Sequence, residues 1–108
     1  MVTVTDRRSL RVEKDLFIHA ERMPDGGFQI QGHDLRGNPL LSDDPDQDYE
    51  YTITVGKRDL RKVVKALGGR RRDDALDLFE ANYPAISKIG ELKWLKSLGI
   101  SPGFWSWP

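Results

Sequence analysis

The sequence predicts a single α+β domain, in which an antiparallel sheet of three to four strands is followed by three helices packed on one face. Apolar residues alternate with polar ones in the first half and recur every three or four positions in the second. Alternation buries one face of a strand, whereas the longer spacing makes one apolar stripe along a helix. With 108 residues, 38% hydrophobic and 31% charged, the chain has the size and composition of one domain over residues 1–108.

Three runs predict the strands, at residues 10–20, 28–33 and 49–55. In the first run the apolar residues of one parity are Leu10, Val12, Leu16, Ile18 and Ala20. Pro24-Asp25-Gly26-Gly27 predicts a tight turn between the first two runs. Val2 and Val4 predict a further short edge strand.

Three helices are predicted after the strands. Gly68-Gly69 ends the first, because glycine adopts the left-handed conformation without a Cβ clash. Asp73-Asp74 opens the second, where acids complement the helix dipole, and Pro84 stops it. The third begins near Ser87 and ends at Gly99. The apolar stripes are Leu60, Val63, Val64 and Leu67 in the first helix, Ala75, Leu76, Phe79 and Tyr83 in the second, and Ile89, Leu92, Leu95 and Leu98 in the third.

The C-terminal end is unusually aromatic, with Phe104, Trp105 and Trp107 within five residues of the last position. Such an end must dock onto the domain or contact a partner. In an extended tail, Trp105 and Trp107 share one face, and Phe104 and Ser106 share the other. We therefore expect one side to fill the groove between the third helix and the sheet, while an aromatic residue stays exposed as an anchor.

An acidic segment precedes the third strand run, with Asp43, Asp44, Asp46 and Asp48. Its alternating aspartates resemble the start of a calcium loop, but Tyr49 and Val55 stand where that loop needs glycine and glutamate. We expect a solvated connection that contacts a basic partner.

A basic stretch covers the first helix and the turn after it. Its members are Lys57, Arg58, Arg61, Lys62, Lys65, Arg70, Arg71 and Arg72. The formal net charge is zero, with 17 basic and 17 acidic residues, and no known nucleic-acid-binding motif is present. A solvated face or a protein contact is the simplest interpretation, and nucleic-acid binding through Arg70, Arg71 and Arg72 is the alternative.

No metal site or catalytic constellation is expected. The chain has no cysteine and only two histidines, His19 and His33. A three-residue turn between their strands would place them opposite each other, whereas a five-residue turn would place His19 against Gln31. Even the first arrangement lacks a convincing third ligand. Neither a nucleophile elbow nor a phosphate-binding loop is present.

Several short sequence motifs occur together in an order that is typical of one group of proteins. They are Gly32-His33-Asp34-Leu35, Tyr49-Glu50-Tyr51, Leu67-Gly68-Gly69, Leu92-Lys93-Trp94-Leu95, and Gly99-Ile100 leading to Phe104-Trp105-Ser106-Trp107. Over residues 28–107 the chain thereby resembles a group of small uncharacterised bacterial proteins of actinobacterial type. The resemblance implies a bacterial, cytoplasmic protein whose aromatic tail belongs to the domain. It implies no catalytic residue.

These observations favour a non-enzymatic protein-interaction module, of which an immunity protein or antitoxin is one concrete form. The alternatives are a nucleic-acid-associated protein with a basic patch and, third, a small hydrolase or metal enzyme around His19 and His33. We expect a protein partner, no cofactor, no membrane contact, and a monomer or weak homodimer.

Overall fold

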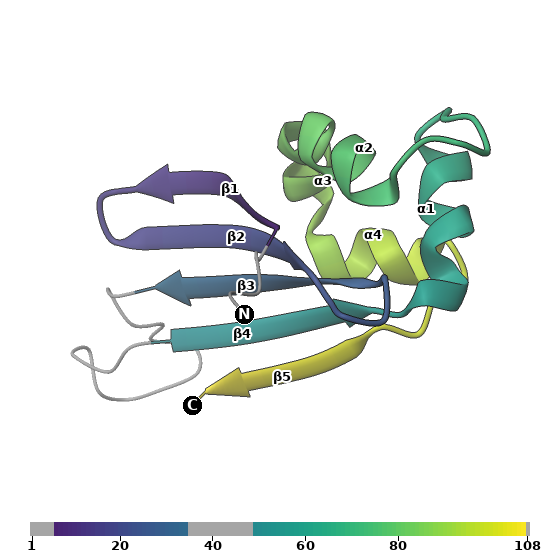
Figure 1. Cartoon of the computed structure of the whole chain (residues 1–108). Coiled ribbons are helices and arrows are strands. Elements are labelled where there is room, and N and C mark those ends of the chain that lie inside the picture. Colours follow the sequence, from purple (N-terminus) through teal and green to yellow (C-terminus); the bar gives the residue numbers. More distant parts are fainter. Residues whose placement is uncertain (1–5, 35–48, 108) are drawn as a thin grey trace, which may run out of the picture.

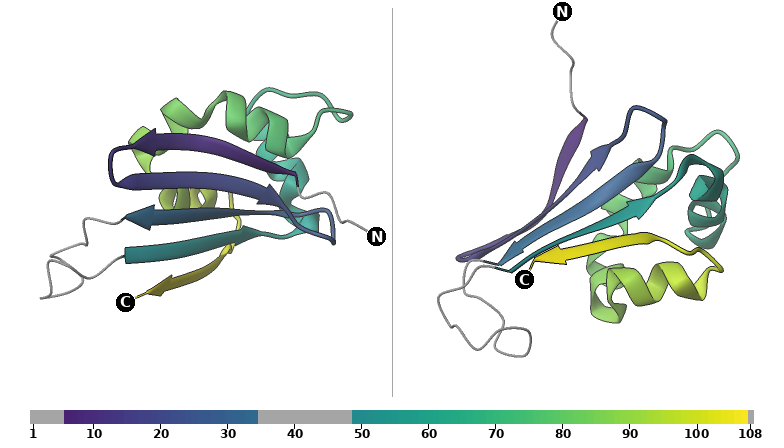
Figure 2. Two further views of the ribbon diagram at one scale, coloured as in Figure 1. Left: turned by 60° about the vertical axis from the view of Figure 1, so that its left-hand side comes forward. Right: turned by 90° about the horizontal axis from the view of Figure 1, so that it is seen from below.

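The computed structural model describes residues 6–34 and 49–107 as one antiparallel sheet with four helices on one of its faces (Figures 1 and 2). The strands lie side by side in chain order: β1 (Arg7–Glu13), β2 (Leu16–Arg22), β3 (Phe28–Asp34), β4 (Tyr49–Val55) and β5 (Gly103–Trp107). The helices are η1 (Lys57–Asp59, a 3-10 turn), α1 (Leu60–Ala66), α2 (Ala75–Ala81), α3 (Tyr83–Ile89) and α4 (Glu91–Ser97). The α+β class is confirmed, with five strands and four α-helices rather than the smaller numbers predicted. Val2, Val4 and the acidic residues Asp43, Asp44, Asp46 and Asp48 lie outside the described residues.

The first predicted strand is in fact two strands. Lys14 and Asp15 form the turn of a hairpin that joins β1 to β2. A register shift between Ser9 and Arg11 adds one residue to β1, which reverses the faces of the residues after it. Val12 is consequently 65% exposed, although its parity with Leu10 predicted a buried residue.

The turn between β2 and β3 decides between the two predicted registers. Arg22 pairs with Phe28, and the five residues between them close the hairpin through Met23 and Gly27, whose backbone groups are 2.8 Å apart. His19 is therefore opposite Gln31, as expected for the five-residue turn.

The C-terminal tail is a strand, which corrects the expectation that it fills a groove beside the last helix. β5 pairs with β4, with Phe104 opposite Ile53 and Trp105 opposite Thr52. Trp105 and Trp107 share one face, as the alternation predicted, but this is the face without helices. Ile53 of β4 points into the core on the helical side, so its neighbour Thr52 and the paired Trp105 point to the opposite face.

Glycine ends two of the helices as predicted. After α1, Gly68 has φ +72°, and the N–H of Gly69 donates to Val64 at 2.9 Å. After α4, Gly99 has φ +82°, and buried Ile100 folds back onto the last turn. Both ends have the hydrogen bonds of a Schellman motif, which satisfies carbonyls that the helix leaves unpaired.

The second half of the helical region differs from the prediction. Pro84 lies in the first turn of α3, where its missing N–H costs no hydrogen bond, so it starts a helix two residues after α2 ends. Ser87 lies inside α3 and donates to the Pro84 carbonyl at 2.9 Å. Gly90, at φ +102°, separates α3 from α4 and leaves Ile89 52% exposed.

The core lies between the sheet and the helices. The Phe79 ring of α2 contacts rings from three other elements, with centroid distances of 5.2 Å to Phe28, 5.9 Å to Tyr83 and 6.0 Å to Trp94. On the same face the Tyr51 ring crosses Gly32, where an added Cβ would lie 2.1 Å from it. A side chain at position 32 would displace this ring.

A charged cluster ties the sheet to α2. Asp74 is the N-cap of α2 and accepts hydrogen bonds from the Leu76 N–H at 3.0 Å and from Arg22 of β2. Arg22 also donates to Asp6 at 3.1 Å, and Arg8 joins Asp6 to Asp77 of α2. Partial burial alone would raise the pKa of Asp74, but the hydrogen bonds from Arg22 and the Leu76 N–H together lower it.

We predict that Asp74→Ala destabilises the domain by about 1–2 kcal/mol, because it removes both the helix cap and the partner of Arg22. Asp74→Asn keeps a good cap and costs less. Because the folded pKa of Asp74 is lowered, its charge stabilises the fold above about pH 4 and loses this effect as the pH falls further. Urea unfolding between pH 3 and pH 6 measures both effects. Equal stability of the Ala and Asn variants would exclude a capping role.

We also predict that deletion of residues 104–108 destabilises the domain by about 3 kcal/mol or more, since it removes the β5 backbone pairing and uncovers Ile53 and Tyr51. The control is Trp105→Ser with Trp107→Ser, which keeps the backbone and should cost about 1 kcal/mol or less. Thermal unfolding followed by circular dichroism compares them. A truncated protein that melts like the full chain would show that β5 adds nothing to the sheet.

Candidate functional site

The helix-free face of the sheet is a regular array. The strand pairings align its side chains in three rows that cross all five strands. From the β1–β2 turn towards the opposite end, the rows are Val12, Phe17, His33, Glu50 and Trp107; then Ser9, His19, Gln31, Thr52 and Trp105; then Arg7, Glu21, Gln29, Thr54 and Gly103. We call this array the open face.

Six polar residues of the open face form three cross-strand pairs along the rows. His19 Nε2 lies 2.6 Å from Gln31 Oε1, His33 Nε2 lies 3.1 Å from Glu50 Oε1, and Arg7 contacts Glu21 at 3.6 Å. Cross-strand pairs of this kind fix side-chain positions on a solvated face. The exposed apolar side chains of this face are therefore the better candidates for contact with a partner.

Those apolar side chains lie at the two edges of the open face. Trp105 and Trp107 on β5 are 55% and 57% exposed, and Phe17 and Val12 on the other side are also exposed. A shallow hollow of about 250 Å³ lies between the edges, lined by His19, His33 and Trp105 among others. Exposed tryptophans beside a shallow hollow are the usual anchors of a protein interface.

The two edge strands differ in how they are protected. β1 carries charged residues and a bulge, which prevent another strand from pairing with it. β5 has the sequence Gly-Phe-Trp-Ser-Trp, with no charge, no proline and no register shift. In the described part of the chain no strand pairs with its outer side, and its composition does not discourage an additional strand.

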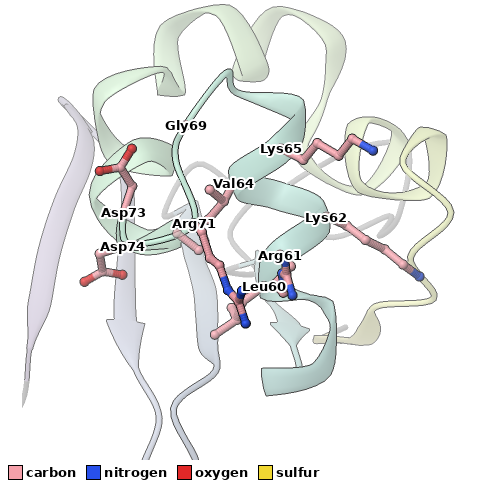
Figure 3. Close-up of a pocket in the computed structure, with 10 residues that line it drawn as sticks. Leu60, Arg61, Lys62, Val64, Lys65, Gly69, Arg71, Asp73 and Asp74 are labelled. Atoms are coloured by element: carbon pink, nitrogen blue, oxygen red, sulfur yellow. The ribbon is translucent and has the colours of Figure 1, made fainter.

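The basic residues lie on the helical side, away from the tryptophans. Arg61, Lys62, Lys65 and Arg71 line a groove of about 490 Å³ between α1 and the turn that follows it (Figure 3). Arg70 and Arg72 are exposed in that turn, and the Arg70 N–H donates to Asp73 at 2.6 Å. No exposed tryptophan lines this groove among the described residues, so the stacking surface that a nucleic-acid site needs is not beside the cations.

One carboxylate inside the helical layer was not singled out from the sequence. Glu91, at the start of α4, accepts hydrogen bonds from the Tyr51 and Tyr83 hydroxyls, both at 2.8 Å. Burial, followed by the charge of Glu91, raises the pKa of both phenols well above the ordinary value. The phenols thus remain donors that join β4, α3 and α4, which is a structural role.

The residues considered for metal binding or acid–base chemistry are not assembled. No group of three or more potential metal ligands occurs in residues 6–34 and 49–107. His19 and His33 bond to different neighbours rather than sharing a site. Asp34 and Glu50 lie on adjacent strands but on opposite faces of the sheet, so their carboxylates do not form a pair.

Comparison of the chain with protein-family models, with curated proteins and with solved structures finds no match. Within the described part of the chain, no helix has the length and apolar character needed to cross a membrane. The function must therefore be inferred from the surfaces themselves.

Proposed function

We propose that this chain is a non-enzymatic protein-interaction module that binds an extended apolar segment of its partner along β5. The partner segment adds a sixth strand to the sheet and places its side chains against Trp105 and Trp107. An immunity protein or antitoxin is one concrete form of such a module. The observation that carries the proposal is the uncharged edge strand β5 with two exposed tryptophans on the open face.

The chemistry of strand addition fits this edge. Backbone hydrogen bonds to β5 would supply affinity without sequence preference, whereas contacts with the tryptophans would supply specificity. Each tryptophan can bury a large area with little loss of side-chain freedom. Because pairing with β4 already orders the backbone of β5, binding does not carry the entropy cost of ordering that strand.

The charge of the open face favours a protein over a nucleic acid. Its three rows hold two carboxylates, Glu21 and Glu50, against one guanidinium, Arg7. A surface that binds single strands by stacking normally tracks the phosphates with basic residues. The tryptophans here have acidic and neutral neighbours, since Trp107 is opposite Glu50 and Trp105 is opposite Thr52.

We predict that a protein captured by the wild-type chain from a lysate of its source cells is lost when both tryptophans are changed, in Trp105→Ser with Trp107→Ser. The matched control, Val12→Ser with Phe17→Ser, removes exposed apolar side chains from the opposite edge of the same face and should retain the partner. With the purified partner, calorimetry should give at least about a tenfold loss of affinity for the tryptophan variant and little change for the control.

Equal binding by the two variants would contradict the proposal, as would binding that depends on Arg70, Arg71 and Arg72 instead. If the wild-type chain forms a dimer that the tryptophan changes dissolve, the strand added to β5 comes from a second copy. Sedimentation of the chain alone detects this outcome. Inhibition of a toxic activity of the captured protein would support the immunity form of the proposal, and a toxin gene beside this one would name the protein to test.

A further inference from the structure

A second surface lies on the helical side of the molecule, in the groove between α1 and the turn at residues 69–74. Its floor is apolar, formed by Leu60, Val64, Gly69 and Ala75. Its rim carries the basic residues Arg61, Lys65 and Arg71. This combination of an apolar floor and a cationic rim is independent of the open face.

The two arginines of the rim are the informative residues. Figure 3 shows the side chains of Arg61 and Arg71 directed to the same side of the groove, beside Leu60, while Lys62 and Lys65 extend away from them. Both arginines are exposed, and neither has an ion pair or hydrogen bond with another described residue. Two guanidinium groups on the same side of a groove attract an anion, because each can donate paired hydrogen bonds to it.

Three other charged residues of the groove already have partners. Lys62 contacts Asp59 at 3.3 Å and donates to the Gly99 carbonyl at 3.1 Å. Asp74 is bonded to Arg22 and to the N-terminus of α2, and Asp73 accepts the Arg70 N–H. Arg61, Arg71 and Lys65 have no side-chain partner among the described residues, and of these only the two arginines extend to the same side of the groove.

We propose that this groove binds an acidic segment of a protein partner, with a carboxylate between Arg61 and Arg71 and an apolar side chain on the floor. Arginine binds carboxylates through paired hydrogen bonds, and the floor offers an apolar residue beside that carboxylate a place to leave water. A nucleic acid fits less well, because no aromatic side chain of the described residues lines the groove to stack against a base.

The test uses the full chain and a phage-displayed library of random peptides. Peptides that bind the chain and are displaced by soluble Asp/Glu-rich competitors are labelled with fluorescein and measured by anisotropy. We expect them to combine Asp or Glu with apolar residues, and to bind Arg61→Glu with Arg71→Glu at least about tenfold more weakly. Replacing the apolar residues of a peptide by serine should also weaken binding, since the floor is then empty.

The matched control is Arg58→Glu with Arg72→Glu, which makes the same change in net charge at two exposed arginines outside the groove lining. This control should bind the peptides within about threefold of the wild type, because general attraction alone is weak. Circular dichroism shows that each variant is folded.

Three outcomes would overturn the proposal: no enriched acidic peptide, equal losses in the groove variant and the control, or a single-stranded oligonucleotide that competes for Arg61 and Arg71 with strongly salt-dependent affinity. The last outcome would assign the groove to nucleic acid. Because Trp105→Ser with Trp107→Ser leaves the groove intact, failure of this proposal is distinguishable from failure of the β5 proposal.

Discussion

The packing of Phe79 against Phe28, Tyr83 and Trp94 is the interaction on which the rest of the structure depends. It joins the sheet to α2, α3 and α4 at one point, and Phe79 itself is fully buried. A domain of this size buries a limited apolar area. With the core centred on Phe79, the helices therefore cover one face of the sheet only. The other face then has no element of the chain left among the described residues to cover it.

This division separates two kinds of surface. The open face carries the exposed tryptophans together with histidine, glutamine and glutamate pairs, and it ends at an uncharged edge strand. The helical side carries Arg61 and Arg71, which have no side-chain partner within residues 6–34 and 49–107, above an apolar floor. The net charge is zero although the two surfaces differ in chemistry. Two such surfaces would let a small module contact a partner at more than one place.

The class, the glycine helix ends and the start of α2 at Asp73-Asp74 were predictable from the sequence, because each depends on local chemistry. It did not resolve the β1–β2 hairpin, since Lys14-Asp15 is a weak turn signal and the bulge reverses the parity on which the prediction relied. Pro84 predicts the end of one helix but equally permits the start of the next, and in the structure it lies in the first turn of α3. The face of Trp105 could not be predicted, because it depends on whether the tail pairs with β4 or packs beside α4. The alternation of faces along the tail is a local property and was predicted correctly. The placement of Arg61 and Arg71 on the same side of one groove depends on the tertiary structure and leaves no pattern in the sequence.

The exposure of the C-terminal tryptophans is the central claim, and acrylamide quenching of single-tryptophan variants measures it most directly. One variant keeps only Trp105 and another keeps only Trp94, with phenylalanine at the other tryptophan positions. The packing around Phe79 predicts blue-shifted, protected emission from Trp94 and red-shifted emission from Trp105 that acrylamide quenches several-fold more strongly. Equal protection of the two in the folded, monomeric protein would mean that the tail is buried, and would contradict a binding surface on the open face.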